Sequence, residues 1–256
     1  MVGNKKYLSL LISSMMVLNI FSQSLPVNYI QTSEDFIEAI KNKKNPENYI
    51  KIFEYADMKV LKNQLATDSQ KFTFWLNIYN GYIQVILLKN PEKYDDRSSF
   101  FKNKQINIAR NIFSFSEIEH GILRHSQHKL FLGYFTIPFV NKLEKNLRVD
   151  KRDFRIHFAL NCGAKSCPPV EVYRLNSLSK DLNNSMIKYL KQTTKYNAEE
   201  NTAYITSLFS WFRGDFGGIS GIKDILFDQN LIPNKKAKLK TTNYDWTLDL
   251  GNFIDL

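Results

Sequence analysis

The residues best suited to chemistry lie in one short stretch, residues 155–169, which holds both cysteines of the 256-residue chain. Cys162 and Cys167 flank a run of small and polar residues that includes Gly163. A cysteine nucleophile needs a lowered thiol pKa, a base within reach and donors for the developing oxyanion. This stretch offers a thiol at Cys162 and backbone N–H groups around Gly163, so it is a candidate site for acyl chemistry.

Side chains elsewhere in the sequence could complete that site. Glu119 directly precedes His120, so its carboxylate could orient the imidazole as a base for Cys162. Asn77 and Asn80 could act as amide donors, as in the Cys-His-amide arrangement of thiol proteases. The first hypothesis is therefore a cysteine-type hydrolase or acyl transferase with Cys162, His120 and Glu119 as catalytic residues. The candidate binding or oxyanion residues are Asn77, Asn80, Arg124, His157, Asn161 and Ser166.

The two cysteines also have an interpretation without catalysis. In an oxidising compartment they would pair, and Gly163 could bring their α-carbons within the roughly 4.4–6.8 Å that a disulfide requires. A persistent Cys162–Cys167 disulfide would exclude the thiol mechanism and leave a stapled loop in a binding domain. A third hypothesis is a non-enzymatic module for a glycan or cell-wall polymer. Glu119 and Asp215 are a carboxylate pair for glycoside cleavage, without a spacing that supports the pairing.

The N-terminus is typical of an export signal. Lys5 and Lys6 give a positive start, residues 7–21 are mostly apolar, and small residues follow at 22–24. The apolar stretch is shorter than the roughly 20 residues that span a bilayer. We expect residues 1–24 to be a signal peptide, the mature chain to lack a transmembrane segment, and the protein to be periplasmic or secreted.

The net charge of +10 bears on the partners. The lysines of the protein could form an ordinary solvated surface. Alternatively, they could form a patch that binds an anionic cell-envelope polymer or a peptide substrate. No recognisable nucleic-acid motif accompanies the charge, so we expect no nucleic-acid partner. His120, His125 and His128 lack the helical spacing of zinc ligands, and we expect neither a metal nor another cofactor.

One long helix is expected to position the candidate amides. It begins at Asp68 or Ser69, ends before Pro91 and is apolar nearly all round, which indicates a buried helix. Asn77 and Asn80 belong to a polar stripe on it. Buried amides need partners, so the stripe either bonds nearby loops or faces a polar cleft.

Shorter elements surround this helix in the prediction. A helix starts at Thr32 or Ser33, and Ser114 with Glu117, or Ser116 with Glu119, fits a capping box. The alternation over residues 154–160 predicts a strand that runs into the cysteine loop. We further expect two short strands within residues 101–115 that turn near residues 109–110, a helix from about 177 to 190, a strand at 202–205, and docking of the aromatic segment 244–248.

Together these elements predict a helix-rich α+β single domain with a small, mainly antiparallel sheet. The domain covers residues 25–256, with an N-terminal helical part at 30–66 and a core at 67–250. The length and a 43% hydrophobic content suffice for one sizeable core.

Five motifs occur in order at residues 75–80, 118–124, 155–168, 209–216 and 244–248. They include Trp75-Leu76-Asn77, Glu119-His120-Gly121 and Asn161-Cys162 with Ser166-Cys167-Pro168. In this combination the chain resembles bacterial members of the family named domain of unknown function 547, from about residue 70 to 250. The resemblance implies a compact helix-rich α+β domain, often exported, and no settled reaction.

Overall fold

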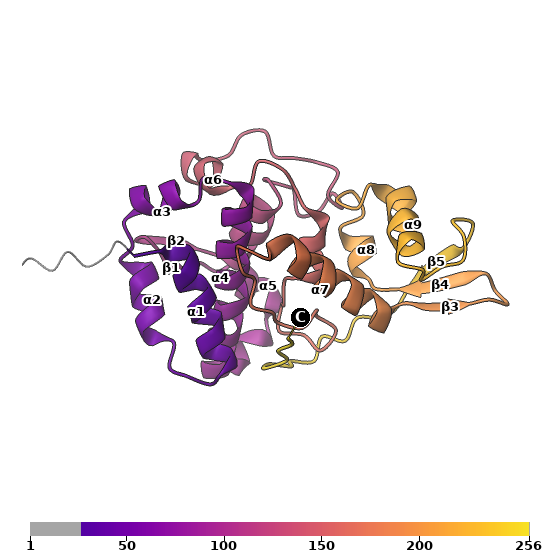
Figure 1. The fold of residues 1–256 in the computed structure, drawn as a ribbon, viewed down its shortest axis with the longest axis horizontal. Coiled ribbons are helices and arrows are strands. Elements are labelled where there is room, and N and C mark those ends of the chain that lie inside the picture. Colours follow the sequence, from indigo (N-terminus) through magenta and orange to yellow (C-terminus); the bar gives the residue numbers. More distant parts are fainter. Residues whose placement is uncertain (1–26, 256) are drawn as a thin grey trace, which may run out of the picture.

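The computed structural model describes residues 27–255, and the expected signal peptide at residues 1–24 lies outside them (Figure 1). The long helix is present as α4 (Asp68–Lys89), and most of its side chains are buried. A capping box starts it, in which Gln70 N donates to Thr67 Oγ1 and Thr67 N donates to Gln70 Oε1. The prediction of this helix is confirmed.

The helix α1 (Tyr29–Lys41) packs against α4. The two approach closely because α4 has Gly81 at the crossing, where a β-carbon would overlap the ring of Phe36. The predicted start of α1 at Thr32 or Ser33 is wrong. The helix begins earlier because the Asn28 side chain accepts hydrogen bonds from the first backbone N–H groups.

Further short elements complete this end of the molecule: α2 (Glu47–Glu54), α3 (Met58–Gln64), η1 (Pro91–Tyr94), α5 (Arg97–Lys102), β1 (Ile106–Ile108), β2 (Asn111–Phe113), the π-helical η2 (Glu117–Leu123) and α6 (Lys142–Leu147). The predicted hairpin is confirmed, since β1 and β2 pair antiparallel. Its turn residues Ala109 and Arg110 have φ of 50° and 59°, as a tight two-residue hairpin turn requires.

The predicted strand at residues 154–160 is wrong. Phe154–Phe158 form a 3-10 helix, η3. Asp153 starts this helix, because its carboxylate accepts from Arg155 N and also holds the Arg155 guanidinium. Alternation of apolar residues could not reveal this local bonding, which favours a helical turn over a pleated chain. The chain then continues as a loop through the cysteines.

Helix α7 (Leu178–Thr193) lies near the middle of the molecule (Figure 1). The opposite end contains β3 (Lys195–Asn197), β4 (Thr202–Ile205), α8 (Leu208–Trp211), α9 (Gly218–Asp228) and β5 (Lys238–Thr241). Strand β4 pairs antiparallel with β3 and parallel with β5, so this sheet is mixed. The predicted strand at 202–205 and the α+β class are confirmed. Across residues 27–255 no helix is long and apolar enough to cross a membrane.

The segment 244–253 returns to the cysteine loop and docks on it, as expected. Lys165 N donates to Thr247 O at 2.8 Å, and Val170 N donates to Asn252 O at 2.8 Å. The segment thereby brings Tyr244 and Trp246 next to residues that are some 80 positions away in sequence.

Candidate functional site

The cysteine loop is closed by a Cys162–Cys167 disulfide, with the two α-carbons 6.1 Å apart. This pairing confirms the disulfide prediction. Since Cys162 carries no thiolate in this form, it is not a nucleophile here, and the hypothesis that gave it that role would require a reduced protein.

Two donors contact the buried sulfur of this disulfide. Cys162 N donates to Cys167 Sγ at 3.0 Å, and the Tyr244 hydroxyl donates to the same sulfur at 3.2 Å. The same hydroxyl lies 3.6 Å from Cys162 Sγ. Cys162 is half-buried and Cys167 is buried, so the two sulfurs differ in both exposure and polar surroundings.

A cavity of about 440 Å³ lies beside the disulfide. Glu119, His120 and Cys162 all line it, so the structure brings the three predicted catalytic side chains to one cavity. His157 and Lys129 line it as well. Apart from Ser116, aromatic and apolar side chains form the rest of its wall, namely Tyr79, Phe101, Leu130, Leu132, Leu160, Leu208, Trp211, Phe212, Tyr244 and Trp246. Such a mixture of apolar walls and a few convergent polar groups is typical of a ligand pocket.

His120 faces this cavity as a neutral ring. Burial lowers the pKa of His120 to about 4, although Glu119 opposes the shift. Arg124 Nη1 lies 2.8 Å from His120 Nδ1. Because a guanidinium only donates, Nδ1 accepts and the ring proton is assigned to Nε2. Glu119 Oε1 lies 3.5 Å from Nδ1 and does not orient the ring, so Arg124 has the orienting role that we expected of Glu119.

Glu119 is largely buried, and its side chain is 17% exposed. The Tyr79 hydroxyl donates to Glu119 Oε2 at 3.4 Å, and burial raises the pKa of Tyr79, which keeps that proton in place. Glu119 does not cap its helix. The capping box is formed by Ser114 and Glu117, in which Ser114 N donates to Glu117 Oε2 at 2.8 Å. The carboxylate of Glu119 is therefore available to the cavity.

Asp215 anchors the cationic side of the site. Arg124 Nε and His157 Nε2 lie 2.7 and 2.8 Å from its Oδ2, and Arg152 Nη1 lies 2.8 Å from its Oδ1. Burial raises the pKa of Asp215, but the hydrogen bonds from His157 and Arg124 outweigh it and lower the pKa to about 2. Burial lowers the pKa of His157 against the pull of Asp215, and its ring stacks on Phe212 at 4.0 Å.

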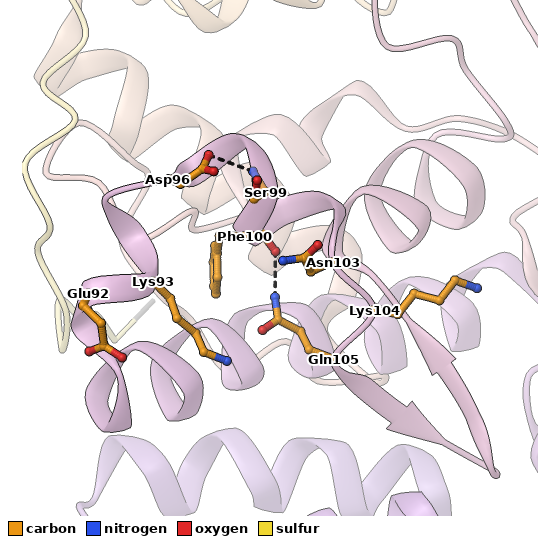
Figure 2. Close-up of a pocket in the computed structure, with 8 residues that line it drawn as sticks. All are labelled: Glu92, Lys93, Asp96, Ser99, Phe100, Asn103, Lys104 and Gln105. Carbon is orange, nitrogen blue, oxygen red and sulfur yellow. Dashed lines mark hydrogen bonds between the residues drawn. The ribbon is translucent and has the colours of Figure 1, made fainter.

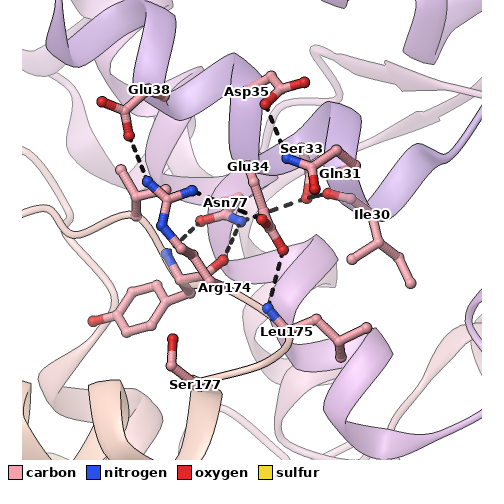
Figure 3. Close-up of polar contacts among 12 residues, drawn as sticks. Ile30, Gln31, Ser33, Glu34, Asp35, Glu38, Asn77, Arg174, Leu175 and Ser177 are labelled. Atoms are coloured by element: carbon pink, nitrogen blue, oxygen red, sulfur yellow. Dashed lines mark hydrogen bonds and ion pairs between the residues drawn. The ribbon is translucent and has the colours of Figure 1, made fainter.

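Asn77 does not reach the cavity. Its side-chain amide donates to Tyr173 O at 2.8 Å and accepts from Tyr173 N at 3.0 Å. Figure 3 shows it beneath the Arg174 and Glu34 contacts that join α1 to the segment before α7. The expected role of Asn77 as a ligand donor is not supported, because both ends of its amide already bond the backbone.

Asn80, Asn161 and Ser166 also have protein partners. Asn80 donates to Ala159 O and accepts from Asn161 N, both at 2.9 Å. Asn161 donates to Pro168 O at 2.7 Å and accepts from Gly163 N. Ser166 Oγ accepts from Asp245 N at 2.8 Å. These polar groups shape the cysteine loop and lie outside the cavity wall.

A second hollow, of about 540 Å³, lies beside α5 (Figure 2). Its polar groups serve the local fold. Asp96 accepts from Ser99 N at the start of α5, and Gln105 donates to Phe100 O. None of the predicted site residues lines it, so the cavity at Glu119 and His120 remains the candidate site.

Sequence reasoning missed much of the cavity wall. Tyr79, Trp211 and Phe212 line the cavity and received no role. Asp215, which bonds the wall residue His157, appeared only as an unsupported partner of Glu119. A signal was present, because these residues belong to the ordered motifs at 75–80 and 209–216, and the motif at 244–248 supplies Tyr244 and Trp246. The missing information was that three motifs from different ends of the chain meet at one cavity.

A family model described as "Protein of unknown function, DUF547" matches residues 63–190, half of the chain. The match includes α4, η2 and the cysteine loop, whereas Asp215, Tyr244 and Trp246 lie beyond it. No curated protein and no solved structure matches the sequence.

Proposed function

Since the chain belongs to the DUF547 family, which has no known function, we propose from its site that it is a hydrolase or acyl transferase. Its substrate would carry a carbonyl group beside an apolar or aromatic part. In this proposal Glu119 is the general base and His120 donates a hydrogen bond to the oxyanion. Cys162 stays in its disulfide, and its sulfur forms part of the wall.

The observation that carries the proposal is the contact of Arg124 with His120 Nδ1 at 2.8 Å. It fixes a neutral imidazole with its N–H on Nε2, and the described residues provide no hydrogen-bond partner for that nitrogen. A preorganised donor aimed into the cavity stabilises charge that develops on a carbonyl oxygen. The cationic guanidinium behind the ring also strengthens this donor.

Glu119 lies next to this donor and supplies the base. Glu119 takes a proton from a water or an acceptor hydroxyl while that oxygen bonds to the carbonyl carbon. The carbonyl electron pair moves to its oxygen, which accepts from His120 Nε2. When this pair returns, the bond to the leaving group breaks, and Glu119 returns its proton to that group. The step needs no thiolate.

The aromatic wall supplies binding. Trp211 and Trp246 stack with ring centroids 5.6 Å apart, and Tyr244 contacts both rings. Lys129 adds a positive charge at the cavity. These groups support a ligand with a flat apolar part and an anionic or polar end.

Hydrolysis of p-nitrophenyl acetate tests the proposal, since this ester has both a flat ring and a carbonyl. Glu119→Gln should lower the enzymatic rate by about 100-fold. Glu117→Gln is the matched control, because Glu117 caps the same helix, pairs with Lys104 and does not line the cavity. A wild-type rate no higher than that of Glu119→Gln would overturn the proposal for this ester class.

Two substitutions at His120 distinguish the role of its donor, Nε2–H, from that of its acceptor, Nδ1. His120→Gln places an amide N–H near the position of Nε2, whereas His120→Asn places an acceptor near Nδ1 and lacks the donor. We expect about 100-fold lower kcat for His120→Asn with little change in KM, and a smaller loss for His120→Gln. Equal losses in the two variants would contradict the role of the donor.

A second candidate is a non-catalytic binding domain of the cell envelope. The disulfide favours it, because disulfides persist in oxidising compartments, and so does the aromatic wall, where Arg97 lies 5.1 Å over the Trp246 ring. Export is part of this proposal, and sequencing the N-terminus of protein recovered from its producing cells tests it. Binding to purified cell-wall polymer that Trp246→Ala abolishes and Glu119→Gln leaves intact would favour this candidate.

A further inference from the structure

The environment of the disulfide points to an activity that does not depend on Glu119 or His120. The two sulfurs are unequal. Cys162 is half-buried and lines the 440 Å³ cavity, whereas Cys167 is 3% exposed. Cys162 is therefore the more exposed of the two cysteines, and the cavity offers a thiolate from solution a route to it.

Cys167 is arranged as the sulfur that leaves. Cys162 N and the Tyr244 hydroxyl both donate to Cys167 Sγ, at 3.0 and 3.2 Å. A disulfide sulfur is a weak acceptor, but a thiolate is a strong one, so these donors stabilise the product of cleavage more than the intact bond. In thiol–disulfide exchange a leaving thiol of lower pKa departs faster.

From this asymmetry we propose that the Cys162–Cys167 disulfide is redox-active and exchanges with small thiols, with Cys162 as the sulfur attacked and Cys167 as the leaving group. The small thiolate bonds to Cys162 Sγ, the Cys162–Cys167 bond breaks, and its electron pair stays on Cys167 as a thiolate. A second small thiolate then attacks the sulfur of the bound thiol. The small disulfide is released, Cys162 becomes a thiolate, and the protein has gained two electrons.

The cavity supports a small anionic thiol as the reactant. Its volume suits a ligand of a few tens of atoms, and Lys129 contributes a positive charge at its wall. The neighbouring cavity of about 310 Å³, lined by Cys167 and Tyr244, is the competing route to the other sulfur. The position of the adduct distinguishes the two routes.

Reduced glutathione is the probe. The oxidised full chain is mixed with it, the reaction is quenched with acid, and the modified cysteine is located by peptide mass spectrometry. We expect the glutathione adduct on Cys162 and a free Cys167. An adduct mainly on Cys167, or a native disulfide that reacts only after denaturation, would overturn the proposal. This mapping needs no variant and is independent of ester hydrolysis.

Tyr244→Phe tests the leaving group by removing one donor to Cys167. We expect exchange to be about tenfold slower, with the adduct still on Cys162. Tyr94→Phe is the matched control, because the buried Tyr94 hydroxyl has no hydrogen-bond partner among residues 27–255. We expect this variant to leave the rate unchanged. A Tyr244→Phe rate within twofold of the wild-type rate, in protein that gives the wild-type circular dichroism spectrum, would refute the role of the hydroxyl.

Discussion

Arg124 Nε lies 2.7 Å from Asp215 Oδ2, although 91 positions separate the two residues. Their side chains are only 1% and 2% exposed. Arg124 follows η2 at one side of the cavity, and Asp215 follows α8 at the other. This pair therefore joins the two halves of the site, and the other end of the guanidinium fixes the tautomer of His120.

Asp215→Asn should be strongly destabilising. It removes the carboxylate that compensates a buried guanidinium, and breaking a buried ion pair in this way costs about 3–5 kcal/mol in the free energy of unfolding. Asp224→Asn is the control, because Asp224 pairs with Lys235 at the surface, where solvent screens such a pair and it contributes little. Urea unfolding of the two variants provides the measurement. Equal losses in the free energy of unfolding would show that the buried pair stabilises the fold no more than the surface pair does.

Stability should fall as the pH is lowered from about 6.5 to about 4, in part because of His120. The unfolded chain binds a proton near the ordinary histidine pKa of about 6.5, whereas folded His120 stays neutral until about pH 4. The unfolded state thus binds more protons in this window, which costs on the order of 3 kcal/mol. In His120→Asn and His120→Gln, the free energy of unfolding should depend less steeply on pH in this window. The reduction in slope should correspond to about one bound proton. If the free energy of unfolding of these variants depends on pH as steeply as that of the wild type, the buried neutral ring is contradicted.

Gly163→Ala should destabilise the cysteine loop. Gly163 has φ of +83°, and a β-carbon there would lie 3.0 Å from Leu87 Cδ1. Gly251 has φ of +76° with open space around it, so Gly251→Ala isolates the backbone cost of about 1–2 kcal/mol. We expect Gly163→Ala to cost more than Gly251→Ala in thermal unfolding. The reverse order would mean that Leu87 moves aside freely.

Reduction of the disulfide should lower the free energy of unfolding by about 2 kcal/mol, the value expected for closing a short loop. The cysteines are five positions apart, which keeps the contribution small. Urea unfolding with and without a reductant measures it, and the Cys162→Ser, Cys167→Ser double variant serves as the control without sulfur chemistry. A protein that unfolds entirely on reduction would show that the disulfide, rather than the hydrogen bonds of Asn80 and Asn161, maintains the conformation of the cysteine loop.

The sequence predicted the local elements where a local signal was strong. α4 follows from a capping residue, a long apolar run and a terminating proline, and the hairpin follows from alternation around a short turn. The 3-10 helix at Phe154–Phe158 was missed, since its cause is the bonding of Asp153 to the neighbouring Arg155 backbone and guanidinium. An apolar residue at every second position is compatible with either conformation.

The sequence named some of the residues that line the cavity, but it did not predict how they are connected. Glu119, His120 and Cys162 do meet at one cavity, yet Asn77 and Asn80 bond the backbone of other segments. Arg124 bridges His120 and Asp215, and nothing in one sequence shows that a guanidinium will contact both. Such contacts depend on how distant segments pack, which is a property of the three-dimensional fold.

The return of residues 244–253 to the cysteine loop also bears on how the protein is made. A ribosome synthesises Glu119 and the cysteines long before Tyr244 and Trp246, so the nascent chain has the polar side of the cavity without its aromatic wall. The cavity therefore becomes complete only after the wall has been translated and docked. A chain cut before Tyr244 would retain the family motifs around the cysteines and lack the finished pocket.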